Sequence, residues 1–252
     1  STNMPVLSVS SRPINSAVGG HLRIIDDEEK KEIISKLKEL IPDAVKIIEF
    51  LLKHQKPAFD IIDRYQSIWD LDSTPLILGN IKVNDEESKS PDEYYSDFDA
   101  EKSAFTGPIS RINHNKKLLS FTAEKMVKKY ALKFPITNPY QTPLCMAIEA
   151  IHCIERSIET IQNAHFENET IPIYNVKEGI GFSAVESAKG TVYHYYEIDK
   201  DGVIIKARII SPIEQNERFL QKAITNIPFD PDKKTRKEVL DEIDFLIDVF
   251  YL

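Results

Sequence analysis

Apolar residues recur at helical spacing in several long stretches of the chain. Asp26 precedes the first stretch and has Glu29 three positions later, which is the arrangement of a capping box. Pro42 either kinks this first stretch or begins a second helix. The periodicity predicts long helices over about 26–66, 118–132 and 143–164, and shorter helices within 212–250.

Two stretches between these helices have a different character. Residues 180–210 change to the composition of strands, and the Asp201-Gly202 turn predicts an antiparallel hairpin there. Residues 82–104 are polar and acidic, which predicts a mobile loop or insertion. The whole chain, 1–252, is therefore expected to form one α+β domain that is predominantly helical. Its helical core spans 26–66 and 118–164, and a small β-hairpin element packs against a bundle of long helices.

Charge and hydropathy argue against general nucleic-acid binding and against a membrane-spanning helix. Forty acidic residues against 32 basic ones give a net charge of −8, which disfavours general binding to nucleic acid. No run of apolar residues reaches the length of ~18 that a membrane-spanning helix needs.

The chain has two cysteines, Cys145 and Cys153, within the helix expected at 143–164. Eight helical residues rise by roughly 12 Å, which is too far for a disulfide. We expect both to be buried structural thiols in a cytoplasmic protein. Gly179-Ile180-Gly181 lacks the third glycine and the following helix of a dinucleotide-binding loop. No zinc-type spacing of cysteine or histidine and no set of catalytic residues can be assigned.

The segment from Glu186 to Asn216 resembles part of the large subunit of nickel–iron hydrogenases. It begins Glu186-Ser187-Ala188-Lys189-Gly190 and continues through His194 and Tyr196, the Asp201-Gly202 turn, and Ser211-Pro212-Ile213-Glu214-Gln215-Asn216. The family pattern is Glu-Ala-Pro-Arg-Gly, a strand with His-x-Tyr, an Asp-Gly turn, and Pro-Thr-x-x-Asn. Other segments are similar to the family in the same order: Arg12–Gly20, Gly107–Asn115, and Asn138-Pro139-Tyr140 with the helix through Glu155-Arg156.

This resemblance covers nearly the whole chain and is nearest to the soluble, multi-subunit type of hydrogenase. The family holds its nickel and iron with four cysteines in two Cys-x₂-Cys pairs, and this sequence contains neither pair. Two further positions differ. Lys189 stands where the family has an arginine that donates to a cyanide on the iron, and Ile213 stands where it has a hydroxyl donor. Lysine lacks the planar, forked donor set of arginine.

The resemblance thus implies the remains of an active-site shell at Glu186, Lys189, Gly190, Pro212 and Ile213, with no catalytic residue, metal or other cofactor. The first interpretation is a hydrogenase-like protein that has lost its metal site and serves as a structural or docking subunit. An iron–sulfur small subunit or another redox-complex protein would be its partner. The second interpretation is a fragment of an active hydrogenase whose cysteine ligands lie outside this chain. A third is a small-molecule binding protein that reuses the emptied cavity.

Overall fold

The structure is a computed structural model of the 252-residue chain. It describes residues 16–17, 20–21, 26–54, 59–69, 80–84, 88–96, 98–163, 175–227 and 234–251. The resemblance noted at Arg12–Gly20 therefore lies mostly outside the described residues.

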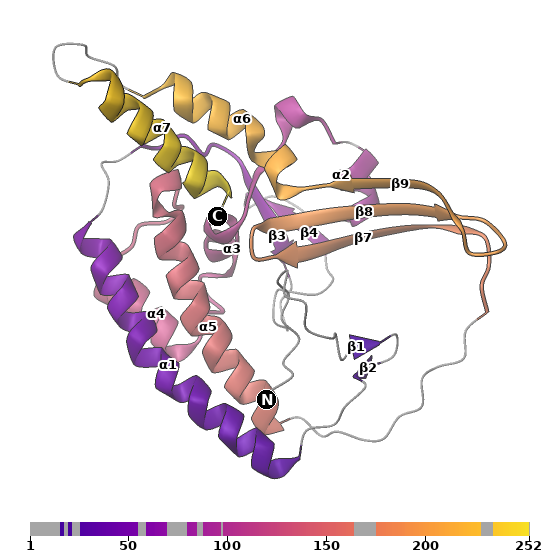
Figure 1. Cartoon of the computed structure of the whole chain (residues 1–252), viewed down its shortest axis with the longest axis horizontal. Coiled ribbons are helices and arrows are strands. Elements are labelled where there is room, and N and C mark those ends of the chain that lie inside the picture. Colours follow the sequence, from indigo (N-terminus) through magenta and orange to yellow (C-terminus); the bar gives the residue numbers. More distant parts are fainter. Residues whose placement is uncertain are drawn as a thin grey trace.

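Helices on one side of the molecule pack against sheets on the other (Figure 1). The helices are α1 (Asp27–Lys53), α2 (Pro91–Ser96), η1 (Ala100–Lys102), α3 (Pro108–Asn115), α4 (Phe121–Lys129), η2 (Pro139–Gln141), α5 (Thr142–Asn163), α6 (Pro212–Thr225) and α7 (Arg236–Tyr251). The strands are β1 (Ser16–Ala17), β2 (Gly20–His21), β3 (Tyr65–Trp69), β4 (Asn80–Val83), β5 (Ser88–Lys89), β6 (Phe105–Thr106), β7 (Gly179–Ser187), β8 (Gly190–Ile198) and β9 (Ile204–Ile210). The predicted α+β class with predominant helix is confirmed.

The first predicted helix is correct at its start and too long at its end. Asp26 caps α1 by accepting from the Glu29 backbone N–H at 2.8 Å, and the Glu29 carboxylate accepts from the Asp26 N–H in return. Pro42 lies inside one continuous helix, so it does not begin a second one. The helix ends at Lys53 rather than near residue 66. The apolar residues beyond it belong to an extended segment, in which Ile61 and Ile62 are buried, and to β3.

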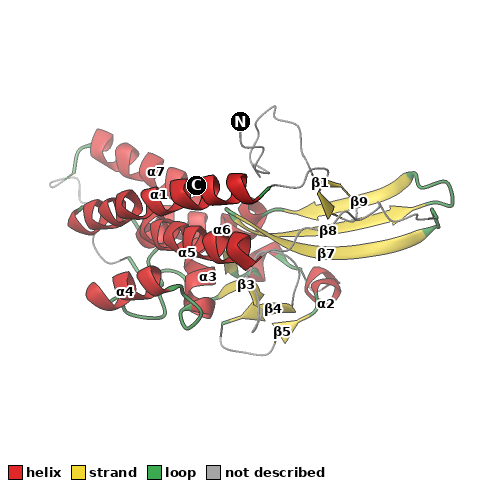
Figure 2. Cartoon of the chain, turned by 90° about the horizontal axis from the view of Figure 1, so that it is seen from below, coloured by secondary structure: helices red, strands yellow, loops and turns green. Residues whose placement is uncertain are grey.

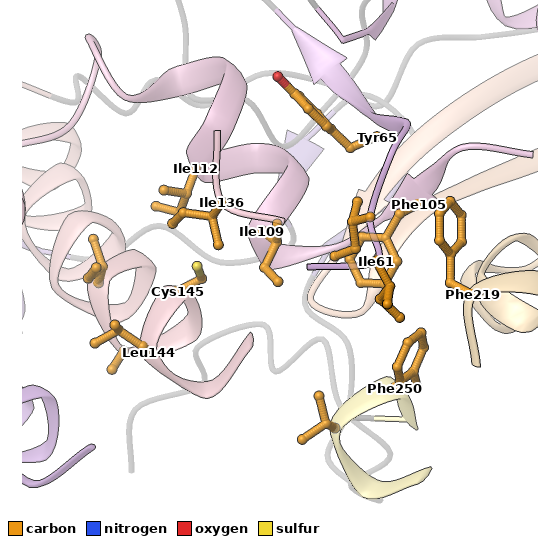
Figure 3. Close-up of a cluster of buried hydrophobic side chains, with 14 of the residues drawn as sticks. Ile61, Tyr65, Phe105, Ile109, Ile112, Ile136, Leu144, Cys145, Phe219 and Phe250 are labelled. Atoms are coloured by element: carbon orange, nitrogen blue, oxygen red, sulfur yellow. The ribbon is translucent and has the colours of Figure 1, made fainter. Parts of the chain in front are cut away.

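The other helical predictions hold more closely. The stretch predicted at 143–164 is α5, which packs along α1 in Figure 1. The stretch predicted at 118–132 contains the shorter α4, and α6 and α7 account for 212–250. Figure 3 shows the core that these helices share, where Leu144 and Cys145 of α5 lie near Ile109 and Ile112 of α3. Phe219 of α6 and Phe250 of α7 pack edge-on against Phe105 in the same core.

The element predicted as a hairpin at 180–210 is a three-stranded antiparallel sheet in the order β7-β8-β9. Gly202 adopts φ +81° in the β8–β9 turn, which is the backbone conformation that the Asp-Gly signal predicts. The additional strand, β7, pairs with β8 from Gly179↔Ile198 to Ser187↔Gly190. The sheet projects from the helical body, and its far end extends beyond the helices (Figures 1 and 2).

The expectation of a loop at 82–104 is wrong for the described residues, while 85–87 and 97 lie outside them. Its described residues form β5, α2 and η1, and β4 and β5 belong to a second sheet in the order β5-β4-β3-β6. Tyr94 of α2 is buried and stacks on Tyr193 of β8, with ring centroids 4.7 Å apart. Ala104 is also buried, so the described part of 82–104 forms a layer that packs on the projecting sheet.

Within the described residues, every helix is too short or too polar to cross a lipid bilayer.

Candidate functional site: a buried arginine between two carboxylates

Two loops meet closely where β7 turns into β8 and where α3 begins. Gly190 has φ +138°, and a Cβ atom there would lie 2.7 Å from a methyl carbon of Thr106. Gly107, directly before α3, has φ +131°, and its Cβ would lie 3.1 Å from the carbonyl oxygen of Lys189. Both positions favour glycine by conformation and by space, which lets the Glu186–Gly190 segment pack directly on the start of α3.

Arg111 of α3 is the centre of this site and is 6% exposed. Its Nε and Nη2 donate to the two carboxylate oxygens of Glu149 on α5, each at 2.7 Å. Its Nη1 donates to the carboxylate of Glu186 at 2.7 Å and to the carbonyl oxygen of Ser187 at 2.8 Å. A fifth bond runs from Nη2 to the carbonyl oxygen of Ala188 at 3.0 Å. Arginine has five N–H donors in a fixed plane, and all five are used here.

Glu186 is fully buried as a side chain and is bonded through both of its oxygens. One oxygen accepts from Arg111, and the other accepts from the Thr191 hydroxyl at 2.8 Å and from the Ile68 backbone N–H at 3.2 Å. These bonds tie α3, β3, β7 and β8 together at one point. A buried charge needs such pairing, since an unpaired one would be strongly destabilising.

The polar network continues from Thr191 towards α6. The Thr191 backbone N–H donates to the Thr106 hydroxyl at 2.8 Å. Asn216 bonds both backbone groups of Thr106, accepting from its N–H at 2.8 Å and donating to its carbonyl at 2.9 Å. Gln215 donates to the Thr191 carbonyl at 2.7 Å and accepts from the amide of Gln66. The start of α6 is thereby fixed to the β7–β8 turn.

The cluster carries two carboxylates and one guanidinium, and this imbalance perturbs its acid–base chemistry. Burial opposes the charge on Arg111, but Glu149 and Glu186 together hold the pKa of its guanidinium above the ordinary value. Burial raises the pKa of Glu149, its pairing with Arg111 only partly offsets this, and the negative charge of Glu186 raises it slightly further. Burial and the charge of Glu149 also raise the pKa of the Cys145 thiol, which keeps the thiol protonated at neutral pH.

The five residues predicted as the remains of a site lie on two neighbouring segments but face different surroundings. Glu186 is 4% exposed, and Gly190 and Pro212 are buried as well. Lys189 is exposed, and Ile213 is 42% exposed at the first turn of α6. The structure thus brings Glu186 and Gly190 into the polar network and places the two substituted positions on the surface.

Arg111 and Glu149 are the residues that sequence reasoning missed as partners. Glu149 interrupts an apolar helix face between Ile148 and Ile151, both fully buried, and that interruption is the one local signal for a buried charge. Its partner lies 38 residues away, and Glu186 lies 75 residues from Arg111. No spacing rule along the chain connects such distant residues.

The two cysteines behave differently, which corrects one prediction. Cys145 is buried as expected, but Cys153 is exposed. Both are free, as their separation along α5 predicts. In the described part of the chain, no three His, Cys, Asp or Glu side chains form a group that could hold a metal ion.

Two pockets formed by described residues lie away from the cluster. One, of about 530 Å³, lies between the first half of α1 and the end of α5. The other, of about 70 Å³, lies between the end of α1, η2 and α7.

Comparison with known proteins connects the chain to hydrogenases. No family model matches it. It is 24% identical over 237 residues to the alpha subunit of sulfhydrogenase 1 from Pyrococcus furiosus, covering 83% of this chain and 53% of the relative. It is 25% identical over 259 residues to an F420-non-reducing hydrogenase subunit of Methanothermobacter marburgensis, covering 86% and 53% of the two chains. The chain therefore spans about half the length of these curated relatives.

Solved structures agree with these sequence matches. An NAD+-reducing [NiFe]-hydrogenase in the H2-reduced state superposes with a TM-score of 0.69 at 16% identity, covering 92% of this chain and 60% of the other. A [NiFeSe] hydrogenase variant from Desulfovibrio vulgaris Hildenborough superposes with a TM-score of 0.60 at 15% identity, covering 92% and 61%. This chain has the fold of the nickel–iron hydrogenase large subunits and is a distant sequence relative of them.

Proposed function

We propose that this chain is a hydrogenase-large-subunit-like protein without a nickel–iron site, and that it serves as a structural or docking subunit of a redox complex. On its own it would not be catalytic. The observation that carries the proposal is the contrast between the fully bonded internal network around Arg111 and the side chains at Lys189 and Ile213, which depart from the pattern of the resembled family.

The donor chemistry of the residues present does not fit a nickel–iron group. Such a site needs several soft thiolate ligands, and the two cysteines of this chain lie eight residues apart on α5, with Cys145 buried and Cys153 exposed. Ile213 has no hydrogen-bond donor in its side chain, and Lys189 offers a flexible ammonium instead of a planar fork. Glu186 already accepts three hydrogen bonds from protein groups.

The buried network of the site serves the fold. Arg111 joins α3 to α5 through Glu149 and to the β7–β8 turn through Glu186, Ser187 and Ala188. Asn216 and Gln215 extend these bonds to α6. A scaffold that presents a surface to a partner needs this network whether or not a metal is bound. The relatives are named as subunits of hydrogenases, which supports an iron–sulfur small subunit or another redox protein as the partner.

One observation favours a second candidate function. The chain spans about half the length of its curated relatives, so a fragment of an active hydrogenase with its cysteine ligands elsewhere fits the coverage equally well. Truncation would remove segments and would not by itself place lysine at 189 and isoleucine at 213, which depart from the pattern of the family that the sequence resembles. The third possibility, a binding protein that reuses the cavity, has less support, since Glu186 is fully buried and lines neither described cavity.

Isolation of the chain from its native source under mild conditions tests the docking role. The proposal predicts a stable complex that contains an iron–sulfur protein and has substoichiometric nickel by elemental analysis. A chain that elutes alone as a monomer would count against the docking role. A complex with one nickel per chain would instead support the fragment of an active enzyme.

A further inference from the structure

Residues 113–136 concentrate positive charge in an otherwise acidic chain. They contain six lysines and a single acidic residue, Glu124, so the segment has a net charge of +5. Because the whole chain carries −8, the remaining residues together carry −13. Such a segregation of charge produces a local positive field that the net charge of the chain conceals. The lysines are Lys116, Lys117, Lys125, Lys128, Lys129 and Lys133, and all six are exposed.

The fold gathers these lysines into one closed segment. Asn113 joins its two ends, because the side-chain amide donates to the Ile136 carbonyl at 2.9 Å and the side-chain oxygen accepts from the Ile136 N–H at 2.8 Å. Lys116 lies over the ring of Phe134, with its Nζ 5.4 Å from the ring centroid. Helix α4 lies between these ends, at the edge of the helical body (Figure 2). We call the exposed side of this segment, with its six lysines, the lysine patch.

The acidic groups around α4 already have partners, which leaves most of the lysines available. Glu124 pairs with Lys128 at 2.6 Å, and Glu49 of α1 pairs with Lys129 at 3.0 Å. Glu155 of α5 accepts hydrogen bonds from the first turn of α4. The lysines of the patch without an ion pair among the described residues are Lys116, Lys117, Lys125 and Lys133.

An exposed aromatic side chain lies within the lysine patch. Phe121 is 79% exposed in the first turn of α4, and Lys125, four residues later, shares its face of the helix. The buried residues of α4 are Ala123 and Met126, so Phe121 takes no part in the core. Leu118, in the loop before α4, is 41% exposed. A few aromatic side chains carry much of the affinity of protein interfaces, so this arrangement favours an anchor surrounded by cations.

We propose that the lysine patch docks on an acidic surface of a partner protein, with Phe121 inserted into an apolar pocket of that partner. This inference rests on the proposed docking role and names the chemistry of the surface that is recognised. The unpaired lysines would steer the partner into place and fix its orientation, because complementary charges at an interface act mainly on association rate and specificity.

A protein fits the lysine patch better than an anionic membrane or a nucleic acid. Those surfaces extend beyond the patch, so their negative field also acts on a body that carries −13. Exposed charges interact over about 8 Å at physiological ionic strength, which includes the acidic residues next to α4. A protein can place carboxylates only opposite the lysines. Both pockets formed by described residues lie away from α4, which agrees with a patch that inserts a side chain and receives none.

Carbodiimide cross-linking of the natively isolated complex tests the contact directly. The reagent joins an amine to a carboxylate where the two are in contact. Mass spectrometry should therefore find Lys116, Lys117, Lys125 or Lys133 linked to Asp or Glu of a second chain. The complex should also dissociate progressively as the salt concentration rises, because salt screens exposed charges.

Matched variants separate the lysine patch from the rest of the surface. Lys125→Glu and Phe121→Ser should each raise the Kd of the reassembled complex by about tenfold or more. Lys200→Glu is the control, because Lys200 is exposed in the β8–β9 turn, at the far end of the projecting sheet, and undergoes the same change of charge. It should leave the Kd unchanged. Lys125→Gln gives a milder test, with a smaller loss than Lys125→Glu, if charge reversal disturbs folding.

The outcomes distinguish this inference from the docking role on which it rests. A complex that forms equally well with Lys125→Glu and Lys200→Glu would overturn the inference and leave the docking role intact. A chain that elutes alone would overturn both. Binding to vesicles of phosphatidylcholine and phosphatidylserine that is lost in Lys125→Glu, with the protein complex unaffected, would assign the patch to a membrane and overturn the inference.

Discussion

Replacement of Arg111 by methionine is the most informative test of the buried cluster. The change removes five hydrogen bonds and leaves the carboxylates of Glu149 and Glu186 without their cation. The Glu186 side chain is 0% exposed and that of Glu149 is 17% exposed, so solvent cannot replace the guanidinium. Removing one partner of a buried ion pair costs about 3–5 kcal/mol.

That loss is large against the total stability of a protein. Unfolding free energies are about 5–15 kcal/mol, so Arg111→Met should remove about a fifth of the total or more. For a chain of this length it should lower the melting temperature by about 10 °C. The deficit should be smaller at acidic pH, because the orphaned carboxylates regain neutrality by binding protons. Thermal and urea denaturation at neutral and acidic pH measure both effects.

A surface arginine provides the matched control. Arg156 pairs with Glu159 on the exposed side of α5, with side-chain exposures of 37% and 56%. Arg156→Met should cost no more than about 1 kcal/mol, because solvent screens such pairs. If Arg111→Met costs as little as Arg156→Met, the cluster does not hold α3, α5 and β7 together as argued.

Three further changes have defined outcomes. Gly190→Ala should destabilise the fold by about 1–3 kcal/mol in thermal melts, because Gly190 has φ +138° and the methyl carbon of Thr106 lies 2.7 Å from the added Cβ. Gly181→Ala is the control and should have little effect, because no atom lies within 4 Å of its added Cβ. Burial raises the pKa of Glu149 above its ordinary 4.5 in the folded protein, so its protonated carboxyl stabilises the fold below that pH, and this stabilisation is lost as the pH rises through the raised pKa. Glu149→Gln should flatten this part of the curve of unfolding free energy against pH. An unchanged curve would refute the assignment. A thiol reagent should label Cys153 in the native protein and Cys145 only after denaturation, and labelling of both at once would contradict the burial of Cys145.

Local sequence signals predict the elements that depend on near neighbours. The capping box at Asp26 and Glu29 sets the start of α1, and the apolar period of α5 gives its bounds to within a residue. The Asp201-Gly202 signal locates the β8–β9 turn because the φ of +81° at Gly202 is a local requirement.

Elements that depend on distant partners are harder to predict. The acidic composition of 82–104 suggests a loop, but Tyr94 and Tyr95 within it stack on Tyr193 and Tyr195, about a hundred residues later. The end of α1 is overestimated because Ile61 and Ile62 continue an apolar pattern while being buried outside a helix.

The candidate site shows the same limit. Family resemblance led to Glu186, Gly190 and Pro212, which are buried where the loops meet. It did not indicate that Arg111 joins Glu186 to Glu149, because that link is made by tertiary packing. Exposure of Lys189 and Ile213 likewise follows from how the β7–β8 turn packs on α3 and α6, not from their own sequence context.

An infrared spectrum of the natively isolated protein, with whatever it carries, tests the central claim most directly. Carbonyl and cyanide ligands on iron absorb in a window that proteins leave nearly empty. We predict no bands there, together with a co-purifying iron–sulfur partner. Carbonyl and cyanide bands would contradict the account, because they would mean that thiolates from another segment or chain complete a working nickel–iron site.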